Sequence, residues 1–495
     1  MPRPRVVPDP LFAGDGKFRV LNRNEGVTDA DYFDRDSYRA AFAEIAEELR
    51  EAGLFERSVP EIENSDLFKL SPFKALNADQ AISLESLLDG LFADIAAGKQ
   101  STSVVRGEPG TGKTVVAIYL IKLLRDIARW EPTEDPVSDS VFAEYFTPEN
   151  ARLLRDFRIA LVVPQQSLRR TIEKVFARTP GLSPSMVLTP FQVGEAADRF
   201  DLLIVDETHR LNQRANQATG VLNAKFPVIN RRLFGEDDVR LTQLDWMEAQ
   251  SDHRLFLVDA AQRVRPADLP RERLDRLIAE TSFDRRFHLR SQMRLAGGND
   301  YIEYVRTLLH PGAARFLEPR TFGDYEFTLY DDLAAMRTRL AAAERTHGLA
   351  RLVAGYAWPW RSRRDRSAYD ISVGDLQLRW NSAARDWISS PDSVDEVGSI
   401  HTVQGYDLNV AGVIIGPDLR FDPVSRRLVF DRSHYFDTKG KENNPTLGKT
   451  YTDDELLEFV TNIYAVLLTR GMRGTLVYVC DGPLRDHLSR YIARA

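Results

Sequence analysis

Short runs of apolar, often β-branched residues alternate with amphipathic stretches along the chain from about residue 71 onward. The runs that read as strands are SVVR (103–106), IALVVP (159–164), LLIVDE (202–207), RLFLVD (254–259), YEFTLY (325–330), RLVAGYAW (351–358), VGSIHT (397–402), VAGVIIG (410–416) and TLVYVC (475–480). Strands that alternate with helices predict parallel sheets covered by helices on both faces. An arginine-rich span, about 263–294, separates two series of runs, so we expect two α/β domains in tandem.

Residues 1–70 differ from the rest and are expected to form a short, mainly helical N-terminal extension. After a Pro- and Gly-rich start, apolar residues recur at helical spacing in SYRAAFAEIAEELREAGLF, and Gly53 suits the end of that helix. The two α/β domains are then expected over 71–285 and 286–495. The extension carries no catalytic pattern, and we interpret it as a docking module for a protein partner or as a packing extension.

The stretch GEPGTGKT joins the first expected strand to a long amphipathic run and fits the pattern G-x-x-x-x-G-K-[ST]. In such a loop, glycines let backbone amides approach phosphate oxygens, a lysine reaches the outer phosphates and a hydroxyl binds Mg²⁺. The helix that follows adds its N-terminal partial positive charge. The sequence therefore predicts binding of a nucleoside triphosphate, ATP, with Mg²⁺. The residues of this predicted site are Gly107, Gly110, Thr111, Gly112, Lys113 and Thr114.

Two adjacent carboxylates end the expected strand LLIVDE. Asp206 is placed to hold Mg²⁺, often through water, and Glu207 to polarise the attacking water as the general base. Adjacent carboxylates at a strand end are also common as solvated turn residues. Their place downstream of a phosphate-binding loop favours the catalytic interpretation, and the two motifs together predict ATP hydrolysis.

The next expected strand ends in Asp259, and Gln262 follows three residues later. A side-chain amide at that strand end is placed to sense the γ-phosphate and to relay its loss to a neighbouring domain. The alternative is purely structural, an Asx turn closed by Asp259.

Taken in order, these motifs resemble those of superfamily-one helicases and translocases over most of residues 71–481. LNADQ is similar to the Q motif, VVPQQSLRRTI to motif Ia, FHLRSQMR to motif IV, SIHTVQGYDLNVAGVIIG to motif V and YAVLLTRGMRG to motif VI. Within that group the phrases AGYAWPW, LRWN, EVGSIHTVQG, GVIIGPDLR and LLTRGMRG make the Schlafen-like DNA/RNA helicase family the nearest resemblance. The resemblance implies two tandem RecA-like P-loop domains with parallel sheets.

The resemblance also implies site residues beyond the phosphate loop and the carboxylates. They are Gln80 at the adenine, Asp407 at the ribose, Arg294 at the γ-phosphate and Arg470 as the arginine finger. Both arginines lie in the second domain, whereas the phosphate loop and the carboxylates lie in the first. Cations from across the cleft would then neutralise charge on the transferring phosphoryl group only when the cleft is shut. Closure would thereby be coupled to the nucleotide.

Two positions depart from the family pattern. Met293 stands where many members have an aromatic residue that stacks on adenine, and Asp407 stands where motif V often has glutamate. Aspartate is one methylene shorter, so it reaches less far toward a ribose. The segment between motif Ia and LLIVDE is too short for the large inserted domain of several duplex-separating members. The motifs therefore predict ATP hydrolysis without assigning duplex unwinding.

Charge composition limits where nucleic acid can bind. The 495-residue chain has a net charge of -7, so a polyanion site must be a local patch. WPWRSRRDR (358–366) combines tryptophans with arginines, a mixture that stacks bases and neutralises phosphates, although an exposed loop beside a core tryptophan fits as well. Arg169 and Arg170 in motif Ia are similarly ambiguous. His209 and His401 fit structural or relay roles, because no group with metal-ligand spacing surrounds either.

Cysteine content and hydropathy indicate the compartment. Cys480 is the only cysteine, which excludes an internal disulfide, and 43% of the residues are hydrophobic, enough for large cores. The longest apolar run, from Val115 to Leu124, is interrupted by Lys122 and is too short to span a membrane. We therefore expect a cytoplasmic protein with no membrane partner.

The sequence as a whole predicts an ATP-dependent motor, a helicase or translocase that acts on single-stranded DNA or RNA. The alternative is a nucleotide-gated ATPase switch or assembly subunit that does not translocate, for example in defence against foreign nucleic acid. A small-molecule kinase is disfavoured, because one P-loop domain would suffice and Arg470 would have no task.

Overall fold

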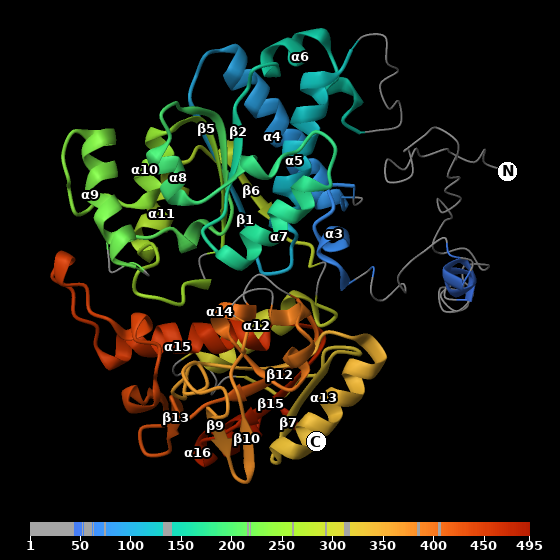
Figure 1. Cartoon of the computed structure of the whole chain (residues 1–495), viewed down its shortest axis with the longest axis vertical. Helices are drawn as coiled ribbons and strands as arrows, with labels where there is room; N and C mark the ends of the chain where they lie inside the picture. Colours follow the sequence, from blue (N-terminus) through green and yellow to red (C-terminus); the bar gives the residue numbers. More distant parts are fainter. Residues whose placement is uncertain are drawn as a thin grey trace.

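The computed structural model describes residues 44–51, 53, 62, 64–73, 76–131, 141–214, 217, 219–259, 262–292, 295–310, 317–383, 387–403 and 407–495. Two six-stranded sheets, one after the other along the chain, form its framework (Figure 1). We call the described residues of 76–289, around the first sheet, the first lobe, and those of 295–495, around the second sheet, the second lobe.

The first sheet is parallel throughout and has the strand order β3-β2-β4-β5-β1-β6. Its strands are β1 (Ser101–Gly107), β2 (Ile159–Val162), β3 (Val187–Leu188), β4 (Phe200–Val205), β5 (Ser251–Val258) and β6 (Arg286–Leu289). Because β4, β5 and β1 are neighbours, the loops at their carboxyl ends meet at one edge of the sheet. The loop of residues 107–114, which the sequence predicts to bind phosphate and which we call the phosphate loop, lies at that edge. The acidic residues predicted at the ends of β4 and β5 lie there too.

Helices cover both faces of the first sheet, as the alternation of its strand residues requires. Val105 and Ile204 face a core shared with α4, α5 and α7, whereas Val104 and Leu203 face a second core shared with α8 to α11. The helices of this lobe are α4 (Ala78–Ala96), α5 (Lys113–Arg129), α6 (Pro148–Leu154), α7 (Gln166–Ala177), α8 (Pro190–Glu195), α9 (Gly220–Phe234), α10 (Gln243–Ala249) and α11 (Arg271–Glu280). Burial on both faces explains why these strands read as continuous apolar runs.

The second sheet is also parallel, with the order β11-β8-β12-β15-β7-β16. Its strands are β7 (Glu326–Tyr330), β8 (Ala350–Ala354), β11 (Val397–Ser399), β12 (Leu408–Ile415), β15 (Gly471–Val479) and β16 (Ala493–Arg494). Val413 and Val477 face a core with α12 (Gly298–Leu309), α15 (Asp453–Leu468) and α16 (Gly482–Leu488). On the other face, Ile414 and Leu476 pack against α13 (Leu333–His347).

The second lobe also contains two short β-hairpins and a short helix outside the main sheet. Two antiparallel hairpins pair β9 (Ile371–Val373) with β10 (Leu376–Leu378), and β13 (Leu419–Asp422) with β14 (Arg427–Phe430). The short helix α14 (Ile400–Val403) follows β11 directly. The sequence predicted one strand over 397–402, but the strand ends at Ser399, where α14 begins.

The chain passes from the first sheet to the second just after β6. The first residues of this crossing segment form hydrogen bonds with the first lobe. Ser291 Oγ donates to Asp79 Oδ2 at 2.7 Å, and Gln292 Nε2 donates to the carbonyl oxygen of Pro109 at 2.6 Å. Pro109 belongs to the phosphate loop, so the crossing segment contacts that loop directly. β6 also extends the first sheet a few residues beyond the boundary at 285 expected from the sequence.

Further hydrogen bonds join the lobes on the side of α15. Asn462 Nδ2 donates to the carbonyl oxygen of Arg263 at 2.9 Å, and the Tyr451 hydroxyl donates to that of Pro266 at 3.3 Å. The acceptors lie in the segment between β5 and α11. This segment, which also carries Gln262, is therefore packed directly against the second lobe.

The predicted fold class, two tandem RecA-like α/β units with parallel sheets, is confirmed. Most of the predicted N-terminal extension, 1–70, lies outside the described residues; within it, residues 44–51 and α3 (Asp66–Lys69) are helical. Across the described ranges, the structure contains no helix that is both long and apolar enough to cross a lipid bilayer.

Candidate nucleotide site between the two lobes

The phosphate loop joins β1 to α5 and depends on its glycines. Gly110 and Gly112 have φ values of 87° and 81°, in the left-handed region that side chains disfavour, and Gly112 caps α5. A Cβ on Gly107 would lie 2.4 Å from Thr111 Oγ1, which itself donates to the carbonyl oxygen of Glu108 at 2.9 Å. The predicted glycines are thus required by the backbone path, which leaves the N-terminus of α5 open to a phosphate.

Lys113, the first residue of α5, folds back over the loop. Its Nζ donates to the carbonyl oxygens of Gly107 and Glu108 at 2.6 and 3.1 Å and lies 4.0 Å from Asp259 Oδ2. The ammonium group is nearly buried, so its charge is directed into the loop. This is the position from which a lysine reaches the outer phosphates of a nucleotide.

Gln80 lies on α4 against the back of the same loop. Its Nε2 donates to the carbonyl oxygen of Thr111 at 3.0 Å, and its backbone and side chain complete a capping box with Asn77. The side chain is 1% exposed. The structure therefore brings Gln80 to the phosphate loop, where it supports the loop backbone.

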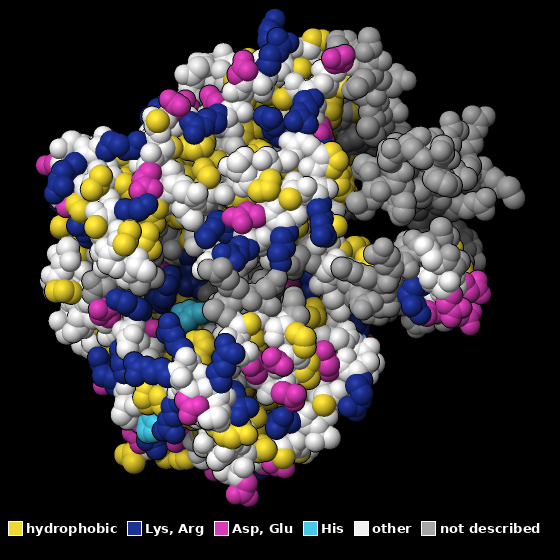
Figure 2. All heavy atoms as spheres, in the orientation of Figure 1, with side chains coloured by type: hydrophobic (Ala, Val, Ile, Leu, Met, Phe, Trp, Pro, Cys, Tyr) yellow, Lys and Arg dark blue, Asp and Glu magenta, His cyan; other side chains and the backbone are white. Residues whose placement is uncertain are grey.

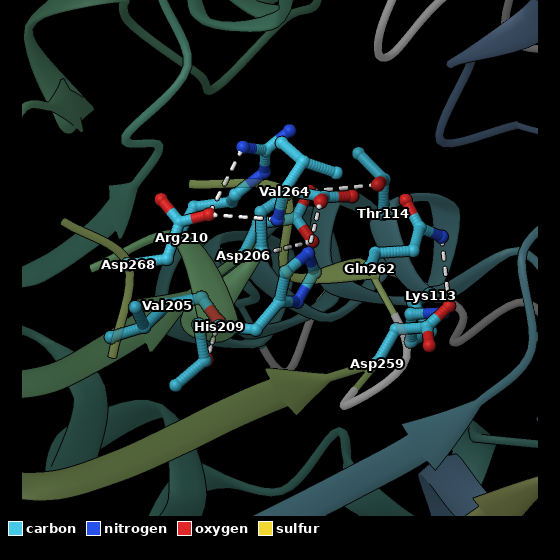
Figure 3. A network of polar contacts seen from close by, with 12 residues as sticks. Lys113, Thr114, Val205, Asp206, His209, Arg210, Asp259, Gln262, Val264 and Asp268 are labelled. Atoms are coloured by element: carbon cyan, nitrogen blue, oxygen red, sulfur yellow. Dashed lines mark hydrogen bonds and ion pairs between the residues drawn. The ribbon is translucent and has the colours of Figure 1, made fainter. Parts of the chain in front are cut away.

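Thr114 and Asp206 form a pair of oxygen donors beside the loop (Figure 3). Thr114 Oγ1 donates to Asp206 Oδ2 at 2.7 Å, and the Glu207 amide donates to Asp206 Oδ1 at 2.9 Å. Burial raises the pKa of Asp206 to about 6, and the neighbouring Glu207 carboxylate adds to the rise. Hard oxygen ligands of this kind, together with phosphate and water, suit Mg²⁺. Among the residues that the structure describes, no group of three or more His, Cys, Asp or Glu side chains forms a metal cage.

Glu207 follows β4 in a strained backbone conformation. Its φ and ψ are 49° and 44°, the left-handed region, which costs a non-glycine residue on the order of 1–3 kcal/mol. Its Oε2 lies 3.0 Å from Nε2 of the fully buried His209, although the two groups are poorly aligned for a hydrogen bond. Burial alone would raise the pKa of Glu207, but His209, with Lys113 and Arg210, outweighs burial and lowers it to about 2. These neighbouring cationic groups thus favour the ionised form of the carboxylate.

A buried ion-pair network continues from this site toward the second lobe. Arg210 Nη1 donates to Asp268 Oδ2 at 3.4 Å, and Arg265 Nη2 donates to Asp268 Oδ1 at 3.2 Å. Asp268 also accepts from the amide of Val264 at 3.1 Å (Figure 3). Its carboxylate therefore fixes the segment that contacts α15, and it binds Arg210, whose charge also lowers the pKa of Glu207. The sequence analysis did not detect the contact of Arg210 with Asp268, because the two residues are 58 positions apart in the chain.

Gln262 connects the phosphate loop to the second lobe. Its Nε2 donates to Asp259 Oδ2 at 2.8 Å, and its Oε1 accepts from Arg470 Nη2 at 3.5 Å. Arg470 comes from the second lobe, directly before β15, and is 3% exposed. The predicted γ-phosphate sensor and the predicted arginine finger are thus in contact.

Of the remaining predicted residues, the structure describes Asp407 but not Arg294. Asp407 immediately precedes β12, and the amide of its neighbour Leu408 donates to the carbonyl oxygen of Arg470 at 3.0 Å. Asp407 therefore lies next to the start of β15. Arg294 and Met293 lie outside the described residues.

Arg306 is a site residue that the sequence analysis missed. It lies on α12 of the second lobe, forms an ion pair with Glu108 of the phosphate loop, and places Nη2 at 3.6 Å from Asp259 Oδ1. A second guanidinium from the second lobe thus lies beside the phosphate loop. Only the tertiary fold brings it there, since α12 carries no recognisable motif.

In motif Ia, Arg169 is held by its own segment. Its Nη1 donates to the carbonyl oxygen of Val163 at 3.2 Å, and Glu173 lies 3.7 Å away. In the view of Figure 2, Lys and Arg side chains gather on both sides of the hollow between the lobes. His401 Nε2 lies 2.8 Å from Asp437 Oδ2, and the structural or relay role expected for this histidine stays a prediction.

Comparison with known proteins identifies the family. A family model described as the Schlafen group 3 DNA/RNA helicase domain matches residues 100–481. The chain is 24% identical over 454 residues to an uncharacterized protein of Saccharomyces cerevisiae, an alignment that covers 87% of this chain and 94% of that protein. Among solved structures it is similar to the arterivirus nonstructural protein 10 helicase in complex with DNA, at 14% identity and a TM-score of 0.32, with 82% of this chain and 67% of that chain covered. The resemblance drawn from the motifs is confirmed, and the chain belongs to the Schlafen group 3 DNA/RNA helicase family.

Proposed function

We propose that this chain is an ATP- and Mg²⁺-dependent nucleic-acid motor, which hydrolyses ATP between its two lobes and acts on single-stranded DNA or RNA in the cytoplasm. The observation that carries the proposal is the side chain of Gln262. It bonds to Asp259 beside the phosphate loop and to Arg470 of the second lobe. A γ-phosphate at the loop would compete for the same groups, so its presence or loss would alter the contact between the lobes.

The proposal gives each residue of the site one role. Lys113 binds phosphate, Thr114 and Asp206 hold Mg²⁺, Glu207 is the general base, Gln262 and Arg294 sense the γ-phosphate, Arg470 stabilises the transition state, Gln80 serves the adenine and Asp407 the ribose. Mg²⁺ held by Thr114 and Asp206 would supply positive charge that offsets the negative charge of the phosphates. As the general base, Glu207 would accept the proton of the attacking water. Burial of the site strengthens each of these electrostatic interactions.

The division of the chain into an N-terminal extension of 1–70 and two RecA-like domains is kept in this proposal. We place the boundary between the domains just past Leu289, where β6 ends, instead of at 285. Docking of a protein partner on the extension remains part of the proposal.

One observation favours the second candidate, a nucleotide-gated switch that does not translocate. Between β2 and β4 the chain contains only α7, β3, α8 and a short 3₁₀ turn, with no inserted domain to separate strands. A switch would use the same ATP site and the same lobe contact, but it would not need a strand to pass along the lobes.

ATP hydrolysis measured with and without single-stranded DNA and RNA separates the two candidates. A motor should hydrolyse ATP faster when either polymer is present, because each step along the strand uses one closure of the lobes. A rate that neither polymer changes would support the switch. Absence of ATP hydrolysis under all conditions would contradict both.

A further inference from the structure

The loop of residues 358–366, which we call the Trp-Arg loop, is not used by the nucleotide site. It follows the carboxyl end of β8 and precedes the β9–β10 hairpin. β8 pairs in parallel with β11, whose carboxyl end leads into α14 of motif V. The loop and motif V therefore lie at the same edge of the second sheet, the edge where parallel sheets bind ligands.

The four arginines of this loop are exposed, and they outnumber the single carboxylate within the loop, Asp365. They are Arg361, Arg363, Arg364 and Arg366. Within the described part of the chain, none of their guanidinium groups forms an ion pair with a carboxylate. Other exposed arginines are paired, as Arg339 is with Glu326. Adjacent cations repel one another, and binding of an external anion would reduce this repulsion.

The buried carboxylate of Asp370 holds the Trp-Arg loop in place through hydrogen bonds. Asp370 is 4% exposed and accepts from the amide and hydroxyl of Ser362 at 2.8 and 2.6 Å and from the amide of Trp380 at 2.8 Å. Arg379 adds hydrogen bonds to the carbonyl oxygens of Ser367 and Ala368, both at 3.2 Å. Because the loop is already ordered, a ligand would bind it with little loss of conformational entropy.

An aromatic cluster lies against the base of the loop. Tyr356 stacks on Trp380 at 5.4 Å between ring centroids and contacts Trp360 at 6.3 Å and His401 at 5.8 Å. Trp360 is half-buried, and its Nε1 donates to Ser362 Oγ at 3.1 Å. The guanidinium of Arg363 lies over its ring at 5.8 Å. Part of the Trp360 ring thus remains accessible beside a cation.

We propose that the Trp-Arg loop is the contact of the second lobe with single-stranded nucleic acid. The guanidinium groups would bind successive phosphates, and the Trp360 ring would stack on an unpaired base. An acidic protein segment would satisfy the arginines but would not need the ring, so the aromatic side favours nucleic acid. The inference rests on the proposed function and deepens it, since it places the strand on the second lobe.

Salt-dependent binding tests the cationic half of this inference. Fluorescence anisotropy would measure the affinity of the full chain for the labelled single strands dT20 and U20 between 50 and 300 mM NaCl. The triple variant R361Q/R363Q/R364Q should reduce the slope of log K against log salt by about 2, because each phosphate contact on a single strand contributes about 0.7. The matched control is R339Q, which removes an exposed arginine that is paired internally, and it should keep the wild-type slope.

Stacking is tested by Trp360→Ala, which should weaken binding of both single strands by about fivefold or more. Binding of a 20-base-pair duplex should change much less, because the bases of a duplex are not free to stack. Trp360→Phe keeps an aromatic face and should restore most of the affinity. Thermal unfolding of each variant checks that the cluster around Tyr356 remains folded.

The outcomes separate this inference from the proposed function. If the wild-type chain binds dT20 or U20 and the triple variant binds with an unchanged slope, the loop is not the contact and the proposed function stands. If the wild-type chain binds neither strand even at 50 mM NaCl, the proposed function fails as well. Displacement of dT20 by polyglutamate of equal charge and concentration would overturn the assignment in favour of an acidic protein partner.

Discussion

The guanidinium of Arg470 lies 3.5 Å from the side-chain oxygen of Gln262, although the two residues belong to different lobes. Gln262 is bonded in turn to Asp259, which lies 4.0 Å from the ammonium of Lys113. A chain of polar contacts thus runs from the phosphate loop into the second lobe. Nearly all of it is buried, where electrostatic interactions are stronger than in water.

Replacement of Arg470 should abolish most ATP hydrolysis. An arginine that stabilises phosphoryl transfer contributes on the order of 10³–10⁵ in rate, so Arg470→Ala should lose at least about a thousandfold in kcat. Phosphate release measures kcat, and binding of a fluorescent ATP analogue should remain within a few fold. Arg473→Ala is the matched control, because Arg473 is an exposed arginine of β15, the strand that follows Arg470 directly. Near wild-type hydrolysis by the Arg470 variant would contradict its role.

Glu207→Gln should bind ATP and hydrolyse it very slowly. The amide keeps the shape of the side chain but cannot accept a proton, and general-base catalysis is worth roughly 10²–10⁴ in rate. The check is a single-turnover assay beside a nucleotide-binding measurement. Glu195→Gln, at an exposed carboxylate paired with Lys225, serves as the control. Undiminished turnover by the Glu207 variant would remove the general-base assignment.

Loss of Arg306 should weaken ATP binding. In Arg306→Gln the carboxylates of Glu108 and Asp259 lose a neighbouring cation and repel the phosphates of the nucleotide. Exposed ion pairs are worth up to about 1 kcal/mol, so we expect an affinity loss of about two- to fivefold, larger at 50 than at 300 mM NaCl.

The double variant Arg306→Gln/Glu108→Gln provides the control for that prediction. Removing the Glu108 charge as well should restore part of the affinity lost with Arg306. Wild-type ATP affinity of the single Arg306 variant at low salt would show that this guanidinium does not act on the nucleotide.

Asp418 should make the second lobe less stable as the pH rises. Its carboxyl group is buried beside Tyr464, and burial raises its pKa to about 7. The unfolded chain loses this proton near pH 4 and the folded chain only near pH 7, so the folded state binds more protons in between. The free energy of unfolding should therefore fall by up to about 1.4 kcal/mol per pH unit from pH 4 to 7, and this contribution should be constant above pH 7.

Asp418→Asn should remove that dependence, because the amide oxygen can still accept from Tyr464 but carries no charge. Urea unfolding at pH 5, 6, 7 and 8 should show the variant gaining stability over the wild type up to pH 7. Asp375→Asn, at an exposed position, should follow the wild type. Parallel pH profiles of the wild type and the Asp418 variant would refute the prediction.

The central strands could be predicted because parallel strands buried on both faces are continuous apolar runs. β4, β12 and the second half of β5 follow this rule, and each expected run overlaps its strand. The edge strands of the first sheet, β6 and β3, do not. β6 alternates exposed and buried residues, with Arg286 and His288 outward, and β3 contains only two residues. Such short or half-exposed strands carry no apolar run, so the sequence analysis missed them.

The same contrast holds in the site. Contiguous motifs revealed Lys113, Thr114 and Asp206, because the backbone of one loop or strand end positions each of them. The contact of Arg306 with Glu108 joins segments that are distant in the chain, and no local pattern marks it. For Gln80, the motif predicted that the residue belongs to the site. Its hydrogen bond to the carbonyl oxygen of Thr111 could be seen only in the tertiary structure.

The described strands of each sheet come from one uninterrupted stretch of chain, and the first sheet is complete at Leu289. During synthesis, domains generally fold as units from the N-terminus onward. The first lobe should therefore acquire its structure on the ribosome before most of the second lobe has been made. Until β6 emerges, however, the edge of β1 lacks its final partner. A nascent chain arrested before β6 should accordingly be more open to proteases and chaperones than one arrested beyond it.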